Sequence, residues 1–309
     1  MDNKTCWVIA GPTASGKTAL SIQLAKKYGC EIVCMDSMQI YRRMNIGTAK
    51  PTIEEMEGIP HHMIDVAEPD EPFSVARYQT MAEECIADIQ DRGKRALLVG
   101  GTGLYLHALR NPMAMGDVSG DETLRAELEA IAATENGKQH LHDMLNAVDP
   151  DTAARLHLND VRRIVRALEV YRLTGVPFSR QPQLQTDSRY AYSVASLTMD
   201  RALLYARIEK RVDAMVNQGL VAEVKSLLDS GIPADCQAMK AIGYKEIIPF
   251  LLGEATWEET DYLLKLNTRH YAKRQLTWMR REEDVYWVDS LQPDAYTKLE
   301  KWFTQGDKT

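Results

Sequence analysis

The sequence predicts an α/β fold, in which a parallel sheet is flanked by helices and carries an inserted all-helical subdomain. Short apolar runs at residues 7–10, 30–35 and 95–99, each followed by a polar or glycine-rich segment, predict the strands. Helical spacing without strands after Gly116 predicts the insertion. Because strands that alternate with helices form parallel sheets, their carboxyl ends should share one edge, where ligands bind in such folds.

The first apolar run leads into a glycine-rich loop and then into a helix-forming segment, residues 19–27. Two glycines bracket four residues, so the backbone amides can wrap a phosphate group, and the helix N-terminus adds partial positive charge. Lys17 supplies an ammonium group and Thr18 a hydroxyl group that can bind Mg²⁺. The pattern predicts a P-loop kinase-like sheet that binds a diphosphate, with Mg²⁺ as cofactor. The predicted diphosphate-binding residues of the loop are Gly11, Pro12, Thr13, Ala14, Ser15, Gly16, Lys17 and Thr18.

The second predicted strand, residues 30–35, ends at Asp36. In an open parallel sheet this end faces the ligand crevice, so Asp36 should lie on the same edge as the P-loop. We interpret it as a functional carboxylate, with a strand-end cap as the alternative reading.

The remaining core elements alternate in the same way, and the strand that ends at residue 99 leads into a second glycine-rich loop. In chain order they are a helix at 74–92, a strand at 95–99, the loop at 100–105, a strand at 190–199, helices at 203–218, 221–230 and 260–281, and an edge strand at 284–288.

The middle of the chain shows helical spacing alone, with cap-like or helix-breaking residues between segments. The predicted helices are residues 121–134, 138–147, 150–158 and 159–174. We therefore expect a catalytic core of residues 1–116 and 184–309 and a helical insertion domain of residues 117–183.

Composition limits the classes of function. A net charge of -7 argues against affinity of the whole molecule for nucleic acid. The five cysteines include no C-x-x-C pair, which argues against a zinc knuckle or a disulfide framework and fits a reducing cytoplasm. We expect a cytoplasmic protein, because neither a signal peptide nor a membrane-spanning segment is predicted.

Local charge differs from the global balance. Residues 265–281 contain six Lys and Arg side chains, no acidic residue, and the aromatic residues Tyr271 and Trp278. Residues 155–180 contain six arginines against two acids. Two basic helices on an acidic protein indicate a surface for a polyanion, whereas a solvated face or internal ion pairs are the alternative.

These segments together resemble the bacterial tRNA dimethylallyltransferases, also called tRNA isopentenyltransferases, over most of the chain. The resemblance is carried by residues 11–18, 36–41, 47–51, 99–105, 163–171, 241–246 and 271–278. One departure is Lys240, where the family commonly has Gln.

The resemblance implies transfer of a dimethylallyl group from dimethylallyl diphosphate to the exocyclic amine of the adenosine just 3′ of the anticodon. The P-loop would then hold the leaving diphosphate, with help from Mg²⁺ on Thr18 and from Arg207 or Arg211. Asp36 would take the proton of the attacking amine. The catalytic residues implied are Asp36, Lys17, Thr102 and Arg207.

The same resemblance implies contacts to the anticodon stem-loop of tRNA, some of them from the insertion domain. We also expect a monomer. The implied tRNA-binding residues are Asp36, Ser37, Met38, Gln39, Thr102, Arg162, Arg163, Arg166, Lys240, Lys245, Lys273, Arg274, Gln275, Trp278 and Arg280.

The chief alternative is a small-molecule or nucleotide kinase, because a P-loop with an inserted helical lid is also the plan of those enzymes. A kinase does not explain the basic, aromatic run at residues 265–281. The strand at residues 95–99 also ends in glycines where many NTPases place a magnesium-binding acid, although Asp36 could replace that acid. An RNA-binding adaptor needs no general base, and the long insertion argues against a free-adenylate isopentenyltransferase.

Overall fold

The computed structural model describes residues 5–111, 120–181 and 188–306 of the chain. It divides into two compact units, Met1–Arg110 with Ser188–Thr309, and Asn111–Asp187. The expected insertion, residues 117–183, falls within the second unit. Its expected ends lie outside the described residues.

The first unit is built on a six-stranded sheet in which all paired strands are parallel, in the order β3-β2-β4-β1-β5-β6. Strands that are covered on both faces read as nearly continuous apolar runs, as Trp7, Val8 and Ile9 do in the middle of the sheet. The predicted parallel sheet is confirmed. The strands are β1 (Thr5–Ala10), β2 (Cys30–Met35), β3 (His61–His62), β4 (Arg95–Gly100), β5 (Ala191–Thr198) and β6 (Val285–Asp289).

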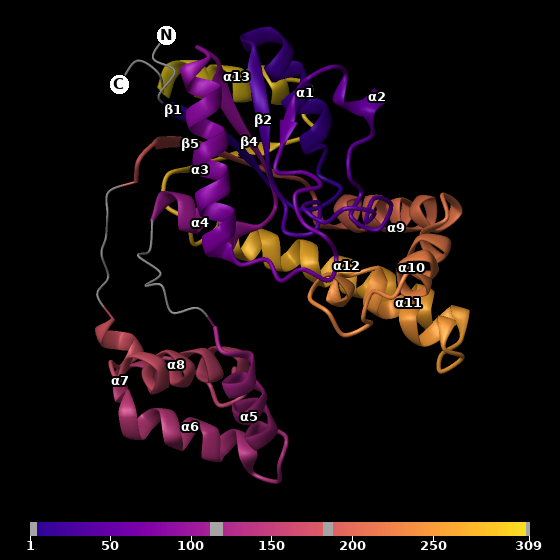
Figure 1. Ribbon diagram of the computed structural model, residues 1–309. Coiled ribbons are helices and arrows are strands. Elements are labelled where there is room, and N and C mark those ends of the chain that lie inside the picture. Colours follow the sequence, from indigo (N-terminus) through magenta and orange to yellow (C-terminus); the bar gives the residue numbers. More distant parts are fainter. Residues whose placement is uncertain (1–4, 112–119, 182–187, 307–309) are drawn as a thin grey trace. The chain divides into compact units, whose positions relative to one another are not determined.

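Helices cover both faces of the sheet (Figure 1). On one face, α3 (Val75–Asp91) and α4 (Gly103–Arg110) pack against the side chains of Val8 and its neighbours. On the other face, α1 (Lys17–Tyr28) and α13 (Ala295–Gly306) pack against Trp7. Helix α13 was not predicted, yet its Phe303 ring stacks on Trp7 with centroids 5.0 Å apart. Loss of such a buried ring costs about 3–5 kcal/mol, so α13 completes the core.

A group of helices between β5 and β6 lies to one side of the sheet in Figure 1. Helices α9 and α12 are joined by two ion pairs, Arg269 to Glu209 at 2.5 Å and Lys265 to Asp213 at 2.7 Å. The elements are α9 (Arg201–Asn217), α10 (Leu220–Asp229), the 3-10 turn η2 (Ala238–Lys240), α11 (Tyr244–Leu251) and α12 (Trp257–Met279). The short α2 (Ile53–Met56) precedes β3.

Helix α12 begins at Trp257, three residues before the predicted start. Thr256 forms a capping box with Glu259, which satisfies amide groups at the helix N-terminus and allows the helix to begin earlier. The sequence-based boundary overlooked this pair.

The second unit is all-helical, with Leu128, Leu141 and Leu168 in its core. Its elements are α5 (Glu122–Ala132), α6 (Gly137–Val148), α7 (Pro150–Ala153), α8 (Val161–Thr174) and the 3-10 turn η1 (Phe178–Arg180). The predicted helix over residues 150–158 is wrong, because α7 ends at Ala153. Residues 154–160 form turns instead, and the amide of Asp160 donates a hydrogen bond to the carbonyl of His157.

Within the described ranges, no helix is both long and apolar enough to cross a membrane.

Candidate active site

The P-loop joins β1 to α1 through three residues at positive φ: Gly11 (145°), Ala14 (62°) and Gly16 (88°). Gly16 precedes α1 in the left-handed region that favours glycine. Ala14 adopts the same region despite its side chain, which costs roughly 1–2 kcal/mol. A residue in this conformation persists only where its surroundings hold it, so contacts to the loop are part of the site.

Two helices outside the loop make such contacts. Arg207 of α9 donates its Nε–H to the carbonyl of Ala14 at 2.9 Å. Gln275 of α12 accepts the amide hydrogen of Thr13 on Oε1, with an N···O distance of 2.9 Å. The strained part of the loop is therefore held from two sides.

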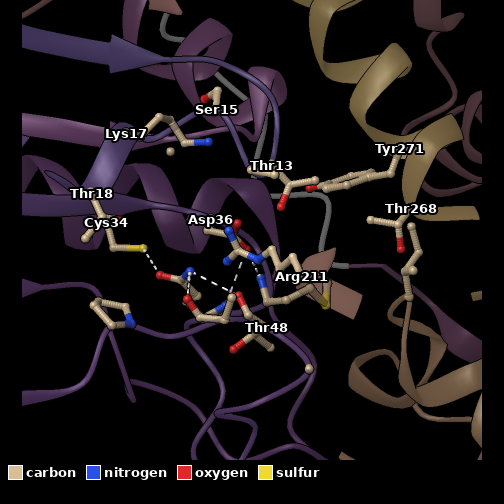
Figure 2. A pocket seen from close by; sticks show the side chains of 18 of the residues that line it. Thr13, Ser15, Lys17, Thr18, Cys34, Asp36, Thr48, Arg211, Thr268 and Tyr271 are labelled. Carbon is tan, nitrogen blue, oxygen red and sulfur yellow. Dashed lines mark hydrogen bonds between the residues drawn. The ribbon is translucent and has the colours of Figure 1, made fainter. Parts of the chain in front are cut away.

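Positive charge is concentrated at the loop. Lys17 donates its ammonium group to the carbonyls of Gly11 and Pro12, at 2.9 and 2.7 Å. Burial and, to a smaller extent, the neighbouring charge of Arg211 lower the pKa of Lys17 to about 8, while Asp36 acts in the opposite direction. Burial also lowers the pKa of Arg211. A bound anion would relieve this repulsion, and Figure 2 shows Lys17, Arg211 and Asp36 around one space.

Asp36 lies directly after β2 and caps the turn that follows. Its Oδ1 accepts the amide hydrogens of Met38 at 2.9 Å and Gln39 at 3.4 Å. Among the described residues, Oδ2 has no hydrogen-bond partner. Both sequence readings therefore fit one side chain, because one oxygen positions the turn while the other is available in the cavity.

One cavity of about 660 Å³ collects most of these groups, a volume in the usual range for a small-molecule site. Its wall also includes apolar side chains from the helices after β5, among them Val212, Met215 and Leu264. The cavity thus has charged groups for an anion and apolar surface for a hydrocarbon. The sequence-predicted residues that line it are Thr13, Ala14, Ser15, Gly16, Lys17, Thr18, Asp36, Ser37, Met38, Gln39, Arg207, Arg211, Lys240, Lys245, Arg274 and Gln275.

Two of the predicted residues are engaged in holding the site together. Thr102 accepts the amide hydrogen of Ser37 on Oγ1 at 3.0 Å, so it fixes the turn that carries Asp36. The Gln39 amide group donates to the carbonyls of Thr48 and Ala49, at 3.2 and 3.3 Å. These contacts position the lining of the cavity.

The two basic runs differ from one another in detail. In α12, Lys265 and Arg269 pair with acids of α9, as the ion-pair alternative anticipated. Lys273 and Arg280 are exposed and form no ion pair with any described residue. These two side chains, together with Arg274 at the cavity, keep their charge available to a polyanion.

Trp278 does not line the cavity. It packs against Gly103, where an added Cβ would lie 2.0 Å from Cδ1 of the indole ring.

The insertion-domain arginines lie on α8, in the second unit. Arg163 pairs with Asp160 at 2.9 Å. Arg166 pairs with the buried Glu169 at 2.5 Å. Burial would raise the pKa of Glu169, but hydrogen bonds from Arg166 and Arg125 bring it below its usual value. Arg162 is exposed.

Sequence reasoning missed the anchor of the loop after Asn45. The carboxylate of Glu223 accepts the amide hydrogens of Asn45, Ile46 and Gly47, and also the hydroxyl hydrogen of Tyr244 at 2.6 Å. The glycine at position 47 was a signal, because a Cβ there would lie 2.5 Å from the Tyr244 ring. The sequence did not indicate which residue it would meet.

The loop has features that fit a phosphate with a bound metal ion. The hydroxyl of Ser15 is buried and has no partner among the described residues, and Thr18 lies exposed at the first turn of α1, in the wall of the cavity. No cluster of three His, Cys, Asp or Glu that could hold a metal exists within the described part of the chain. A Mg²⁺ ion here would take its oxygen ligands from Thr18 and from the diphosphate itself, the usual preference of this ion.

Residues 39–282 match the model of the IPP transferase family. The chain belongs to the IPP transferase family. It is 50% identical over 298 residues to a tRNA dimethylallyltransferase of Geobacillus thermodenitrificans, covering 96% of this chain and 94% of that protein. It is 52% identical over 283 residues to a tRNA dimethylallyltransferase of Desulforudis audaxviator, covering 91% of each.

Solved structures agree with this family. The full-length tRNA isopentenylpyrophosphate transferase of Bacillus halodurans is 46% identical, with a TM-score of 0.73 over 99% of this chain and 96% of that chain. A eukaryotic dimethylallyltransferase described as acting on tRNA is 32% identical, with a TM-score of 0.81 over 98% of this chain and 79% of that one. The predicted family and fold are therefore confirmed.

Proposed function

We propose that this chain transfers a dimethylallyl group from dimethylallyl diphosphate to the exocyclic amine of the adenosine 3′ to the anticodon in tRNA. The observation that carries the proposal is the single cavity that the P-loop and Asp36 line together with apolar side chains. Family membership and the names of the relatives support the reaction and the tRNA substrate. A monomeric state and a cytoplasmic location remain predictions from the sequence.

The P-loop would hold a leaving group. When the carbon–oxygen bond of the donor breaks, its electron pair stays on the diphosphate, which gains negative charge as it departs. The loop amides, Lys17 and Arg211 are arranged to stabilise that charge before the reaction begins. Bound Mg²⁺, held by Thr18 and the diphosphate oxygens, would neutralise a further part of the charge.

Asp36 would act as the general base. The exocyclic amine of adenosine is a weak nucleophile because its lone pair is delocalised into the purine ring. As the new carbon–nitrogen bond forms, a proton must leave the nitrogen, and Oδ2 of Asp36 is the free oxygen that can accept it.

The target adenosine must leave its stack to enter the cavity. Such a step needs contacts to the surrounding phosphates. The exposed Lys273 and Arg274 of α12 and Arg280, directly after the helix, would supply them. On the second unit, Arg162 is the predicted RNA contact that is exposed without an ion pair to a described residue.

The test is transfer of label from dimethylallyl diphosphate to three acceptors: an unmodified tRNA, the same tRNA with guanosine at the target position, and free AMP. We expect label only in the unmodified tRNA. Labelled AMP would instead indicate a free-adenylate enzyme. An absence of label, together with phosphate transfer from ATP, would indicate a kinase.

A further inference from the structure

Gln275 lies in the basic run of α12, but its side chain does not face solvent. It is 5% exposed, whereas its neighbours Lys273 and Arg274 are exposed. Its Oε1 accepts the amide hydrogen of Thr13 in the P-loop at 2.9 Å. One helix therefore presents charge outward and a single amide side chain inward to the loop.

The second glycine-rich loop makes room for this side chain. A Cβ at Gly101 would lie 1.9 Å from Nε2 of Gln275 and 3.0 Å from the carbonyl oxygen of Gly11. Gln275 is therefore enclosed between the two loops, and its orientation is fixed by packing as well as by the hydrogen bond.

The hydrogen bond falls beside the strained residue of the P-loop. Ala14, with φ of 62°, follows Thr13 directly, and its carbonyl accepts from Arg207 of α9. The loop is thus held by α12 on the amide before Ala14 and by α9 on the carbonyl of Ala14 itself. Ala14 also packs in one apolar cluster with Ala272 of α12, but the acceptor oxygen of Gln275 is the hydrogen bond from this helix that fixes the backbone beside Ala14 in the left-handed region.

We propose that Gln275 is a positioning residue for the donor: it holds the P-loop in the shape that receives a diphosphate, and it does not contact tRNA. The inference rests on the proposed function in taking the diphosphate of an allylic donor as the ligand. It replaces the sequence-based expectation that Gln275 binds tRNA, which its burial and its engaged oxygen argue against.

The test compares binding of inorganic diphosphate, in magnesium buffer without tRNA, with binding of tRNA. Gln275→Met keeps the length and volume of the side chain but removes the acceptor. We expect it to bind diphosphate about tenfold more weakly, the scale of one lost hydrogen bond, and to raise the donor KM similarly. The kcat at saturating donor and the Kd for tRNA should stay within about twofold of wild type.

The matched control is Lys273→Met, two residues away on the exposed side of α12. It should weaken tRNA binding and leave diphosphate binding unchanged. Hydrogen exchange of the Thr13 amide adds a readout that does not depend on turnover: exchange should accelerate about tenfold in Gln275→Met. Gln275→Glu keeps an acceptor oxygen, so it should restore protection of that amide even though its charge repels diphosphate.

The outcomes separate the two proposals. If the wild-type protein binds no diphosphate, the proposed function fails. If wild type and Gln275→Met bind diphosphate equally, or if Gln275→Met loses tRNA binding instead, the positioning role is overturned. If Gln275→Met does not fold, hydrogen exchange of the Thr13 amide is measured in Gln275→Glu. Faster exchange of this amide than in wild type, in the folded variant, would contradict the positioning role.

Discussion

The two glycine-rich loops of the first unit look alike in sequence but use glycine for different reasons. They follow neighbouring strands, since Ala10 of β1 pairs with Gly100 of β4. In the P-loop, Gly16 has φ of 88°, and an added Cβ would meet only the Arg207 side chain, at 3.9 Å. In the second loop, Gly101 and Gly103 do not have positive φ, yet a Cβ at either would lie within about 2 Å of α12 side chains.

The difference separates ligand binding from assembly. The P-loop needs glycine for its conformation, and that conformation turns a strand-to-helix connection into an anion site. The second loop needs glycine for space: it admits Trp278 and Gln275 of α12, and Gln275 then reaches Thr13 of the P-loop. Changes in the first loop should therefore affect the ligand, and changes in the second should affect packing.

The largest expected effect tests the role of the P-loop as an anion site. Lys17→Ala should lower the single-turnover rate of transfer by about 10²–10³-fold, because it removes a charge that stabilises the leaving diphosphate. Thermal unfolding of the free protein should not shift to a lower temperature, since burial lowers the pKa of Lys17 and its charge therefore does not stabilise the free fold. A variant that unfolds readily would instead make Lys17 a structural residue.

Asp36→Asn separates the two oxygens of Asp36. Asn keeps the Oδ1 acceptor for the amides of Met38 and Gln39 but cannot take a proton. We expect turnover to fall by at least about 10²-fold, while donor and tRNA bind as in wild type. Near-normal single-turnover transfer by this variant would rule out the general-base role, and Asp36→Ala measures the added loss of the cap.

The sequence predicted those parts of the site that consist of consecutive residues. The P-loop and the position of Asp36 after β2 follow from local patterns, and both line the cavity. The bond between Thr13 and Gln275 joins residues 262 positions apart, and no local pattern specifies it. Gln275 was assigned to tRNA by the family resemblance, as part of the basic run at residues 265–281.

The same limit explains the unpredicted C-terminal helix. In α13, Ala295, Leu299 and Phe303 recur at four-residue intervals and are all buried, which is a helical pattern. The helix has only 12 residues, and its partner Trp7 lies near the other end of the chain. Without that partner the pattern alone did not reveal that the segment belongs to the core.

A matched pair of glycine substitutions tests the contrast between the loops directly. Gly103→Ala forces a Cβ into the Trp278 ring and should destabilise the fold by about 1–3 kcal/mol. Gly16→Ala strains the backbone at the anion site and should weaken diphosphate binding by roughly tenfold. Thermal unfolding and calorimetry with diphosphate measure the two effects. If the two variants exchanged these effects, the assignment of the loops would be wrong.

The smallest expected effect is a pH dependence at Lys17, which faces Arg211, Asp36 and Cys34. With its pKa lowered to about 8, Lys17 loses its charge as the pH rises past 8, and diphosphate affinity should fall by up to about tenfold per pH unit there. The unfolded chain binds more protons than the free folded protein above pH 8, so its stability should rise over the same window. Lys17→Met should show neither trend. Diphosphate itself also titrates, but this contribution is the same for both proteins and cancels when wild type is compared with Lys17→Met at each pH.

In the proposed function, the P-loop binds the diphosphate of an allylic donor and does not drive phosphoryl transfer. The most direct measurement is dimethylallyl transfer to unmodified tRNA in magnesium buffer free of nucleotides, beside ATP consumption without donor. Since cleavage of the carbon–oxygen bond already provides a leaving group, we expect transfer at its full rate without ATP, no transfer when magnesium is chelated, and negligible ATP turnover. Transfer that required ATP, or rapid ATP consumption in the absence of donor, would contradict the proposed function and indicate that the protein is a kinase.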